Sequence, residues 1–386
     1  MPILTKNIRN VAIVGQQGSG KTTLTEAILY RTGAISKMGS TKDGSTVTDY
    51  DRLEKERGFT INPSLVYTTW KDKKINLIDT PGFPDLIEKV RSILKVVEIS
   101  LMLLSPDTIS GSEIRRVYSY SEKEKLSYLI FLNKIEGGEI NFPAVLEQIK
   151  KQLNLNPLLL TYPFVKDKKV VGIIDLIRMK GIVYTQGEGR EEDIPEELIS
   201  TVTDFREKLM ESVAETDDQL IEKYLENGDL TEEEIKQGLK EGILSGKLIP
   251  LLTGSALSGM GVDVLLDILV DFFPSPDWRG SVKGMLPGKE DEQVERKVDS
   301  SQPLCAQVFF TLSEMHLGEV SFIKVFSGNL SSGSSVYNAG KNEDEKIGQI
   351  YLMRGNKREE TPQPVSYTHL RAHETSLHLV CRLLLE

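Results

Sequence analysis

Short apolar runs alternate with longer stretches of mixed polarity in the first part of the chain. Residues 11–15, 75–79, 99–104 and 129–134 read VAIVG, INLID, ISLMLL and LIFLNK. Each run is apolar and partly β-branched, as expected of a strand that is covered on both faces. Segments of helical character, such as DLIEKVRSILKVV, lie between these runs. The alternation over residues 8–153 predicts βαβ units and a mainly parallel sheet, which is an α/β fold.

The pattern changes after residue 158. The stretch VVGIIDLIRMKGIVY at 170–184 predicts two strands joined by a tight connection. An acidic region follows, in which one face of a helix is expected to be buried because apolar residues keep helical spacing at Leu198, Val202, Phe205, Leu209 and Val213. Thr231 and Glu234 form a capping box, which marks the start of a further helix. We therefore predict an α+β region at about 158–250.

Two further segments end the first domain and lead out of it. The stretch KLIPLLTGSALSGMGVDVLLDILVDF at 248–273 predicts a last strand, a loop and a final helix. The first domain is therefore expected to span residues 8–273. Residues 274–303 are rich in Pro, Gly, Ser and charged side chains and predict a linker.

A period of two begins after the predicted linker and is typical of strands with one covered face. The apolar face is formed by Leu304, Ala306, Val308 and Phe310, and the opposite face by Gln307 and Thr311. The turn-rich stretch SGNLSSGSSVYN follows. We predict the start of an antiparallel, all-β barrel domain over residues 304–360.

The last 26 residues, 361–386, break this pattern. They contain three of the four histidines and one of the two cysteines of the chain. We interpret the segment as a foreign or frame-shifted tail that is not native, because the composition changes and the predicted barrel is unfinished. The alternative is a short amphipathic helix with apolar residues at Leu377, Val380, Leu383 and Leu384.

Composition narrows the class of protein without fixing its function. The 386 residues are enough for two or three domains, and a net charge of -10 argues against a non-specific coat on nucleic acid. We expect no sequence-specific DNA binding. Two cysteines are too few for a disulfide framework or a cysteine metal site, and no apolar run is long enough to cross a membrane. We therefore expect a soluble, cytoplasmic protein with no membrane partner.

Eight consecutive residues match the phosphate-binding pattern G-x-x-x-x-G-K-[ST], namely Gly15, Gln16, Gln17, Gly18, Ser19, Gly20, Lys21 and Thr22. A predicted strand precedes them, and a predicted helix that includes Thr23 follows, which is the context this motif needs. The glycines let backbone amides surround phosphate oxygens, Lys21 brings a full charge to the β- and γ-phosphates, and Thr22 is placed to ligate Mg²⁺. The alternative is a glycine-rich turn that binds nothing, which the flanking strand and helix disfavour.

Two later elements fit the same site. Asp79 ends the INLID strand and Gly82 follows three residues later, which suits a water-mediated Mg²⁺ contact and a backbone N–H to a γ-phosphate. Thr60, in ERGFTI, is expected to reach Mg²⁺ and to close a mobile loop over the γ-phosphate. The alternatives are an ordinary D-T-P-G turn and a strand-edge threonine. We predict Lys21, Thr60 and Gly82 as catalytic residues and Thr22, Thr60 and Asp79 as the metal-binding residues.

A third loop is expected to read the base. Asn133, Lys134 and Glu136 follow the LIFL strand in the pattern N-K-x-E, close to the guanine-reading pattern N-K-x-D. A carboxylate here accepts hydrogen bonds from guanine and rejects adenine. The longer Glu136 makes this selectivity plausible without assuring it, and the alternative is a surface loop that contains these residues by chance. A backbone N–H for guanine O6 is expected from Ser255, Ala256 or Leu257.

With these motifs, the chain resembles elongation factor G, the translational GTPase family that drives translocation on the ribosome. The resemblance rests on GSGKTTLTEAILYRTGAI, ERGFTI, INLIDTPG, GIIDLIRMKGIVY, TGSAL and FIKVFSGNLSSGSSVYN, and it covers residues 8 to about 360. It implies a P-loop GTPase domain with an inserted G′ region and the start of domain II. It also implies GTP or GDP and Mg²⁺ as ligands and the ribosome as partner, and we expect a monomer. The family continues into domains III to V, so we expect a C-terminally truncated chain.

Departures from the family pattern point to a divergent paralogue. Phe83 stands where the family has histidine, and Glu136 stands where it has aspartate. The stretch TKDGSTVTDYDRLEKERGFT also resembles a divergent elongation factor G-like subgroup. In the family, the histidine positions the attacking water, and a phenyl ring has no donor or acceptor for this. We therefore expect GTP binding to be retained and hydrolysis to be slow or dependent on a partner.

Other functions remain open at this point. The chain is consistent with a nucleotide-dependent ribosome-binding module that acts by occupancy, with weak or no hydrolysis. A ribosome-protection protein that removes an antibiotic shares this domain order. A non-translational P-loop ATPase is the least favoured, because it would leave the inserted region and the barrel unexplained.

Overall fold

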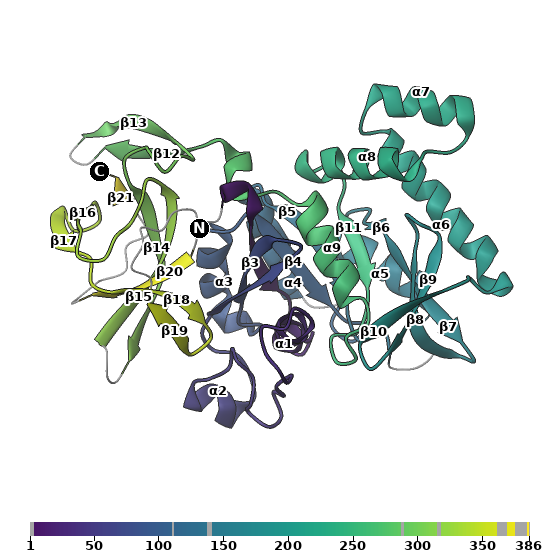
Figure 1. The fold of residues 1–386 in the computed structure, drawn as a ribbon, viewed down its shortest axis with the longest axis horizontal. Coiled ribbons are helices and arrows are strands. Elements are labelled where there is room, and N and C mark those ends of the chain that lie inside the picture. Colours follow the sequence, from purple (N-terminus) through teal and green to yellow (C-terminus); the bar gives the residue numbers. More distant parts are fainter. Residues whose placement is uncertain are drawn as a thin grey trace.

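The computed structural model describes residues 4–109, 112–136, 141–286, 289–314, 318–360, 369–374 and 384–385. Figure 1 shows three parts along the long axis of the molecule. An α/β domain lies in the middle, the inserted region of about 158–250 lies at one end, and the β-rich part that follows residue 304 lies at the other.

The central domain is built on a seven-stranded sheet in the order β2-β3-β1-β4-β5-β11-β6. These strands are β1 (Ile8–Val14), β2 (Ser64–Trp70), β3 (Lys73–Asp79), β4 (Ile99–Leu104), β5 (Ser127–Leu132), β6 (Leu158–Leu159) and β11 (Pro250–Thr253). β2 is antiparallel to β3, and the other neighbours are parallel. Every residue of β1 and β4 is buried, which explains why these runs are apolar throughout. The predicted mainly parallel α/β fold is confirmed.

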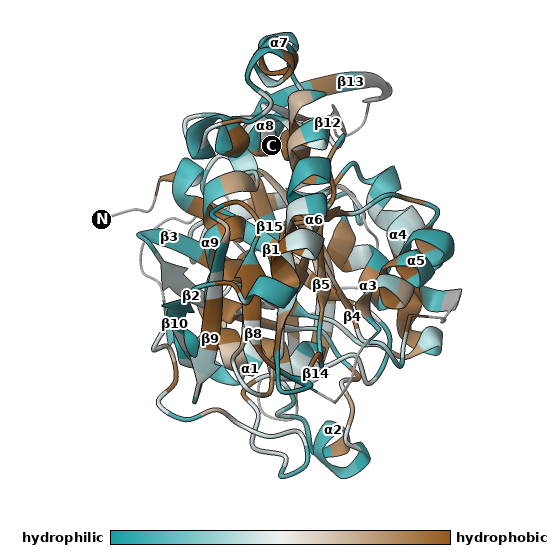
Figure 2. Cartoon of the chain, turned by 90° about the vertical axis from the view of Figure 1, so that its right-hand side faces the viewer, coloured by the Kyte–Doolittle hydropathy of each residue, from teal (hydrophilic) through white to brown (hydrophobic). Residues whose placement is uncertain are grey.

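Helices and short 3₁₀ turns surround this sheet. They are α1 (Lys21–Arg31), α2 (Arg52–Arg57), α3 (Ile87–Leu94), α4 (Ser112–Lys123), α5 (Phe142–Leu153), α9 (Val262–Phe272), η1 (Thr5–Asn7), η2 (Pro84–Leu86) and η3 (Pro276–Arg279). Local sequence sets several starts: Asp51 and Glu54 form a capping box for α2, and Asn141 caps α5. Figure 2 shows hydrophobic residues concentrated on inner strands such as β1 and β5 and hydrophilic residues on α2. In the described ranges, no helix combines the length and apolar character that a membrane span requires.

The inserted region is α+β, as the sequence pattern predicted. Its antiparallel sheet has the order β10-β9-β8-β7, formed by β7 (Thr161–Lys166), β8 (Lys169–Asp175), β9 (Lys180–Thr185) and β10 (Glu188–Glu192). Its helices are α6 (Glu196–Ala214), α7 (Asp218–Asn227) and α8 (Glu232–Leu244). Both hydrogen bonds of the Thr231–Glu234 capping box form at the start of α8. Val202, Leu209 and Val213 are buried on α6, which confirms its apolar face.

The predicted linker requires a correction, because residues 274–303 contain regular structure. After η3, β12 (Ser281–Leu286) and β13 (Lys289–Lys297) form an antiparallel ribbon. Its register places Lys283 opposite Glu295, so opposite charges face each other across the two strands. The sequence of β13, KEDEQVERK, has too few apolar residues to show an alternation, which is why the pattern predicted only a linker.

The second domain is antiparallel, as predicted. Its strands are β14 (Cys305–Glu314), β15 (Gly318–Ser327), β16 (Ser335–Asn338), β17 (Glu343–Lys346), β18 (Ile350–Arg354), β19 (Lys357–Glu360), β20 (His369–Glu374) and β21 (Leu384–Leu385). Six of them form a sheet in the order β19-β18-β20-β15-β14-β21, and β16 pairs with β17. β20 and β21 lie within the segment 361–386, and they pair with β15 and β14. Of the four leucine and valine positions suggested for a helix there, Leu384 is in a strand, and the other three lie outside the described residues.

β14 departs from the predicted one-sided alternation. The register between β14 and β15 shifts between Val308 and Phe310, so Phe310 leaves the face that contains Ala306. The Nζ of Lys89 on α3 lies 5.8 Å from the centre of the Phe310 ring. Gln307, which we expected on an open face, is buried as well. The strand is covered on both sides because its second face packs on α3 of the central domain, and a single-strand pattern cannot anticipate such a contact.

Candidate nucleotide-binding site

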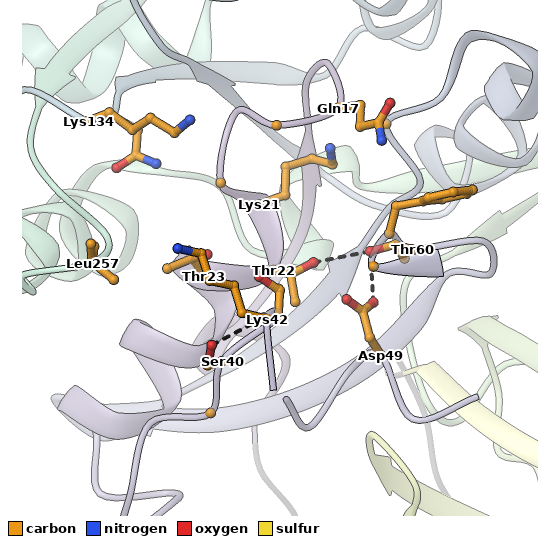
Figure 3. A pocket seen from close by; sticks show the side chains of 18 of the residues that line it. Gln17, Lys21, Thr22, Thr23, Ser40, Lys42, Asp49, Thr60, Lys134 and Leu257 are labelled. Carbon is orange, nitrogen blue, oxygen red and sulfur yellow. Dashed lines mark hydrogen bonds between the residues drawn. The ribbon is translucent and has the colours of Figure 1, made fainter. Parts of the chain in front are cut away.

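A cavity of about 560 Å³ opens where the parallel strands of the central sheet end. Loops that follow β1, β3, β5 and β11 contribute to its walls, as expected at the carboxyl edge of such a sheet. Figure 3 shows Lys21 near the centre of this cavity, Thr60 and Asp49 on one side, and Lys134 and Leu257 on the other. The structure therefore brings the three predicted motifs around one space.

The loop between β1 and α1 has the backbone shape that its glycines allow. Gly18 and Gly20 have φ of 81° and 99°, in the left-handed region that other residues rarely adopt. A side chain on Gly20 would also clash with the amide group of Asn133. Thr22 and Thr23 lie in the first turn of α1 and line the cavity, so the helix N-terminus faces the space that a phosphate would fill.

Lys21 is buried at the base of this loop, where its Nζ donates a hydrogen bond to the Gln16 carbonyl at 3.1 Å. Burial lowers the pKa of Lys21 to about 8, and the nearby Asp79 and Asp49 oppose that shift. The Ser19 hydroxyl and the Gln16 side-chain oxygen are also buried, and neither has a hydrogen-bond partner among the described residues. A buried ammonium and a free hydroxyl fit an oxygen-rich anion in this loop.

Hydroxyls and carboxylates form a connected network beside Lys21. Thr22 Oγ1 donates to Asp79 Oδ2 at 2.8 Å and lies 3.1 Å from Thr60 Oγ1. Thr60 Oγ1 donates to Asp49 Oδ1 at 2.8 Å, and Thr48 Oγ1 donates to Asp79 Oδ2 at 3.1 Å. The two threonines and the aspartate that we predicted for the metal site are thus in contact (Figure 3 shows the bonds among Thr22, Thr60 and Asp49).

The residues of this network fit a hydrated Mg²⁺ ion. Asp79 Oδ1 is buried and accepts no hydrogen bond within the described part of the chain, so it has a free lone pair for a metal-bound water. Burial, together with Asp49, raises the pKa of Asp79 to about 7, and a cation would favour its charged form. The described residues contain no cluster of three His, Cys, Asp or Glu side chains suited to a metal. The hydroxyls of Thr22 and Thr60 are the groups in this network that could ligate the ion directly.

Gly82 approaches the phosphate loop through its carbonyl group. Gln17 N donates to Gly82 O at 2.9 Å, and a side chain at Gly82 would clash with the backbone nitrogen of Gln17. Only glycine allows this approach. The sequence predicted a role for the Gly82 amide, whereas in this structure its carbonyl faces the loop.

Phe83 lines the cavity directly after Gly82 and contacts a second aromatic residue. Its ring centre lies 4.8 Å from that of Phe59, with the ring planes inclined at 36°. Phe59 precedes Thr60, so the contact joins the segment that carries Thr60 to the segment that carries Gly82. An aromatic pair of this kind has no polar atom with which to hold a water molecule.

Asn133 connects the phosphate loop to the far side of the cavity. Its Nδ2 donates to Ser19 O at 2.8 Å, and its Oδ1 accepts from Ala256 N at 2.8 Å. The side chain is buried, and it joins its own loop after β5 to the phosphate loop after β1 and to the loop after β11. The sequence pattern suggested base reading by this residue, and the structure shows that its polar atoms are engaged by the protein.

Lys134, Glu136 and Leu257 complete the far end of the cavity. Lys134 has a φ of 64°, a left-handed conformation that turns the chain sharply after Asn133. The amides of Ser255 and Ala256 donate to Met260 O and to Asn133 Oδ1, so neither is directed at a base. Leu257 lines the cavity and is 73% exposed. Among Ser255, Ala256 and Leu257, it is therefore the best placed to offer a backbone amide to guanine O6.

Sequence reasoning missed several residues between α1 and α2. Thr48 and Asp49 belong to the network around Asp79, and Met38, Ser40 and Lys42 line the cavity. Their stretch, MGSTKDGSTVTDY, lacks both a periodic pattern and a motif with fixed spacing. The clustering of hydroxyl and carboxyl side chains in TVTDY was the one available signal.

Comparisons with known proteins agree with this geometry. Residues 6–275 match the elongation factor Tu GTP-binding domain, and residues 303–364 match elongation factor G domain 2. A crystal structure of a protein from Thermus thermophilus superposes with a TM-score of 0.84 at 28% sequence identity. The match covers 98% of this chain, whereas the chain spans 54% of that protein. The chain therefore belongs to the translational GTPase family, with a GTP-binding domain followed by domain 2 as in elongation factor G.

Proposed function

We propose that this chain binds GTP together with Mg²⁺ and that the intact protein couples GTP binding and hydrolysis to translocation on the ribosome. One observation carries the proposal: a single cavity is lined by Lys21 and Thr22 at one end and by Glu136 and Leu257 at the other. A guanine nucleotide needs both ends, because its phosphates and its base lie at opposite ends of the molecule. The ribosome as partner, a monomeric state and a cytoplasmic location are parts of the same proposal.

The phosphate end supplies charge and orientation. Lys21 would balance the charge of the β- and γ-phosphates, and the loop amides would donate to their oxygens. Thr22 and Thr60, whose hydroxyls lie 3.1 Å apart, would ligate the Mg²⁺ ion, and Asp79 would hold one of its waters. When bound, the ion would neutralise charge that develops between the β- and γ-phosphates. These groups stabilise a phosphoryl transfer by position and electrostatics.

The base end supplies selectivity. Glu136 is exposed and lines the cavity, so its carboxylate is free to accept hydrogen bonds from guanine N1–H and the exocyclic amine. Adenine has no hydrogen on N1 and would leave the carboxylate unpaired. Asn133 would act indirectly, because it fixes the loop that carries Glu136 to the loop that carries Ala256.

Replacing Glu136 with glutamine tests this assignment. We expect the affinity for GDP to fall by about 10- to 100-fold, because the change removes hydrogen bonds to a charged acceptor. Xanthosine diphosphate has a carbonyl in place of the exocyclic amine, and the new amide can donate to it. We therefore expect Glu136→Gln to bind xanthosine diphosphate more tightly than the unchanged protein does. Fluorescence competition against labelled GDP measures both affinities.

A neighbouring lysine on the same loop provides the control for this experiment. Lys134→Gln alters the charge of the loop without altering the proposed acceptor, and it should not improve xanthosine binding. If Glu136→Gln left the preference between guanine and xanthine unchanged, Glu136 would not be the base-reading residue.

A titration of the full chain with GTP, GDP and ATP, with Mg²⁺ and with EDTA, tests the proposal as a whole. Tight ATP binding, or no uptake of any nucleotide by folded protein, would contradict it.

A second function is favoured by the contact between Phe59 and Phe83. This aromatic pair occupies the region where the family histidine would hold the attacking water, so hydrolysis is expected to be slow or to depend on a partner. The alternative is therefore a ribosome-binding or ribosome-protection protein that acts mainly by nucleotide-dependent occupancy. Release of γ-phosphate in the presence of ribosomes distinguishes the two functions.

A further inference from the structure

A segment without helix or strand carries two residues of the phosphate-side network. We name residues 39–49, between α1 and α2, the strap. Near its end, Thr48 donates to Asp79 and Asp49 accepts from Thr60, so the strap holds one side of the network. The position of these two residues depends on what fixes the strap.

The inner side of the strap is fixed by one carboxylate. Glu26 is fully buried on α1, one helical turn after Thr22. Its Oε2 accepts a hydrogen bond from Gly39 N at 2.8 Å, and its Oε1 accepts one from Val47 N at 2.6 Å. A single side chain therefore anchors both ends of the strap to the helix that begins at the phosphate loop.

The outer side of the strap meets the second domain. The hairpin formed by β18 and β19 turns at Gly355, which has a φ of 59°. A side chain at Gly355 would clash with the carbonyl oxygen of Val47, so the two backbones touch. The amide of Gly355 also donates to Leu65 O on β2 at 2.9 Å. Val47 thus lies between Glu26 on one side and the tip of this hairpin on the other, immediately before Thr48 and Asp49.

Side-chain contacts also bind the hairpin to the central domain. The charged groups of Arg354 on β18 and Lys74 on β3 lie over the ring of Tyr67 on β2, 4.6 Å and 4.9 Å from its centre. The Tyr67 hydroxyl also donates to Glu359 Oε2 at 2.5 Å. These contacts come from both strands of the hairpin, so its tip has a defined position relative to the strap.

We infer that Gly355 and Val47 are positioning residues, through which the second domain sets the place of Thr48 and Asp49 beside the nucleotide. The inference rests on the proposed binding of GTP and Mg²⁺. It adds that the β18–β19 hairpin of the second domain regulates this binding. Coupling between two sites is reciprocal, so binding of GTP with Mg²⁺ also stabilises the contact between the hairpin and the central domain. GDP depends less on the strap, because Lys21 and the base loop belong to other elements.

Two glycines in the same domain provide a matched test. Gly355 and Gly333 both have positive φ, but a side chain at Gly333 meets no atom within 4 Å. Alanine therefore has a similar backbone cost at both positions, and only Gly355→Ala displaces Val47. We expect Gly355→Ala to weaken GTP binding about tenfold and to raise the Mg²⁺ concentration needed for it by a similar factor. Binding of GDP should change by less than about twofold, and Gly333→Ala should resemble the unchanged protein in every measurement.

A second pair of variants covers the case in which Gly355→Ala does not fold. Glu359 and Glu360 are both exposed, and only Glu359 bonds Tyr67 in the described contacts. Glu359→Gln is expected to weaken Mg²⁺-dependent GTP binding about threefold, whereas Glu360→Gln should not. Equal GTP binding within each pair would overturn the inference. Failure of the unchanged protein to bind GDP would instead contradict the proposed function, so the two failures can be told apart.

Discussion

Replacing Lys21 with alanine is expected to weaken the binding of both GTP and GDP by at least about 100-fold. Lys21 is 6% exposed, so its charge acts on the phosphates with little screening by water. A hydrogen bond to a charged group contributes about 1.5–3 kcal/mol, and the ammonium of Lys21 would make more than one. The variant also leaves Asp79 and Asp49 without their nearest cation, which disfavours a second negative group nearby.

Isothermal titration with GTP and GDP in excess Mg²⁺ measures this effect. Lys42 is the matched control, because it lines the same cavity but is exposed on the strap. Lys42→Ala is expected to change either affinity by less than about threefold, as is usual for an exposed charge. A Lys21→Ala protein that is folded and binds GTP normally would show that the loop after β1 is not the phosphate site.

Replacing Phe83 with histidine is expected to raise the rate of GTP hydrolysis by about 10²–10³, which is the usual effect of one positioned polar group in a transition state. Histidine provides a nitrogen that can orient water at the place where the phenyl ring now contacts Phe59. Binding of GTP should be nearly unchanged, because Lys21, Thr22 and Asp79 are not altered. Release of γ-phosphate measured with and without ribosomes tests the prediction.

Phe83→Leu separates the chemistry of histidine from the loss of the aromatic contact. Leucine also disrupts the pairing with Phe59 but supplies no polar atom. It should therefore leave the rate of hydrolysis unchanged. If leucine accelerated hydrolysis as much as histidine, release of the aromatic contact would be the cause, and the missing water-binding group would not. If neither variant changed the rate and the unchanged protein already hydrolysed GTP rapidly on ribosomes, hydrolysis would not be impaired by Phe83.

The sequence alone was sufficient where structure depends on neighbours in the chain. The phosphate loop needs glycines at fixed spacing, a lysine and a hydroxyl within eight residues, and the adjoining strand and helix complete its geometry. The apolar runs of the central sheet were equally clear, because strands such as β1 and β4 are buried on both faces. The capping box before α8 is also local, since both of its hydrogen bonds join residues three positions apart. In each case the physical cause acts over a few residues, so the sequence records it directly.

Sequence reasoning failed where contacts join distant parts of the chain. The ribbon of β12 and β13 is formed by backbone pairing between largely polar strands, which have no apolar period. The second face of β14 is covered by α3, which lies far earlier in the chain, and a register shift moves Phe310 out of the expected alternation. Neither feature can be inferred from one strand, because each depends on the surface that the strand meets.

In the candidate site, too, some residues were predicted from local motifs, whereas the roles of others became clear only from the fold. Lys21, Thr22, Asp79 and Glu136 were predicted as candidates from motifs, whose spacing reflects the loops that carry them. The role of Asn133 as a bridge between loops, and the place of Asp49 beside Thr60, required the folded chain. The contact between Gly355 and Val47 joins opposite ends of the chain, and no periodicity or spacing encodes such a distance. Local sequence thus determined which groups are candidates for holding a nucleotide, whereas only tertiary packing decided how those groups are positioned, because position is set by backbones that meet through the fold.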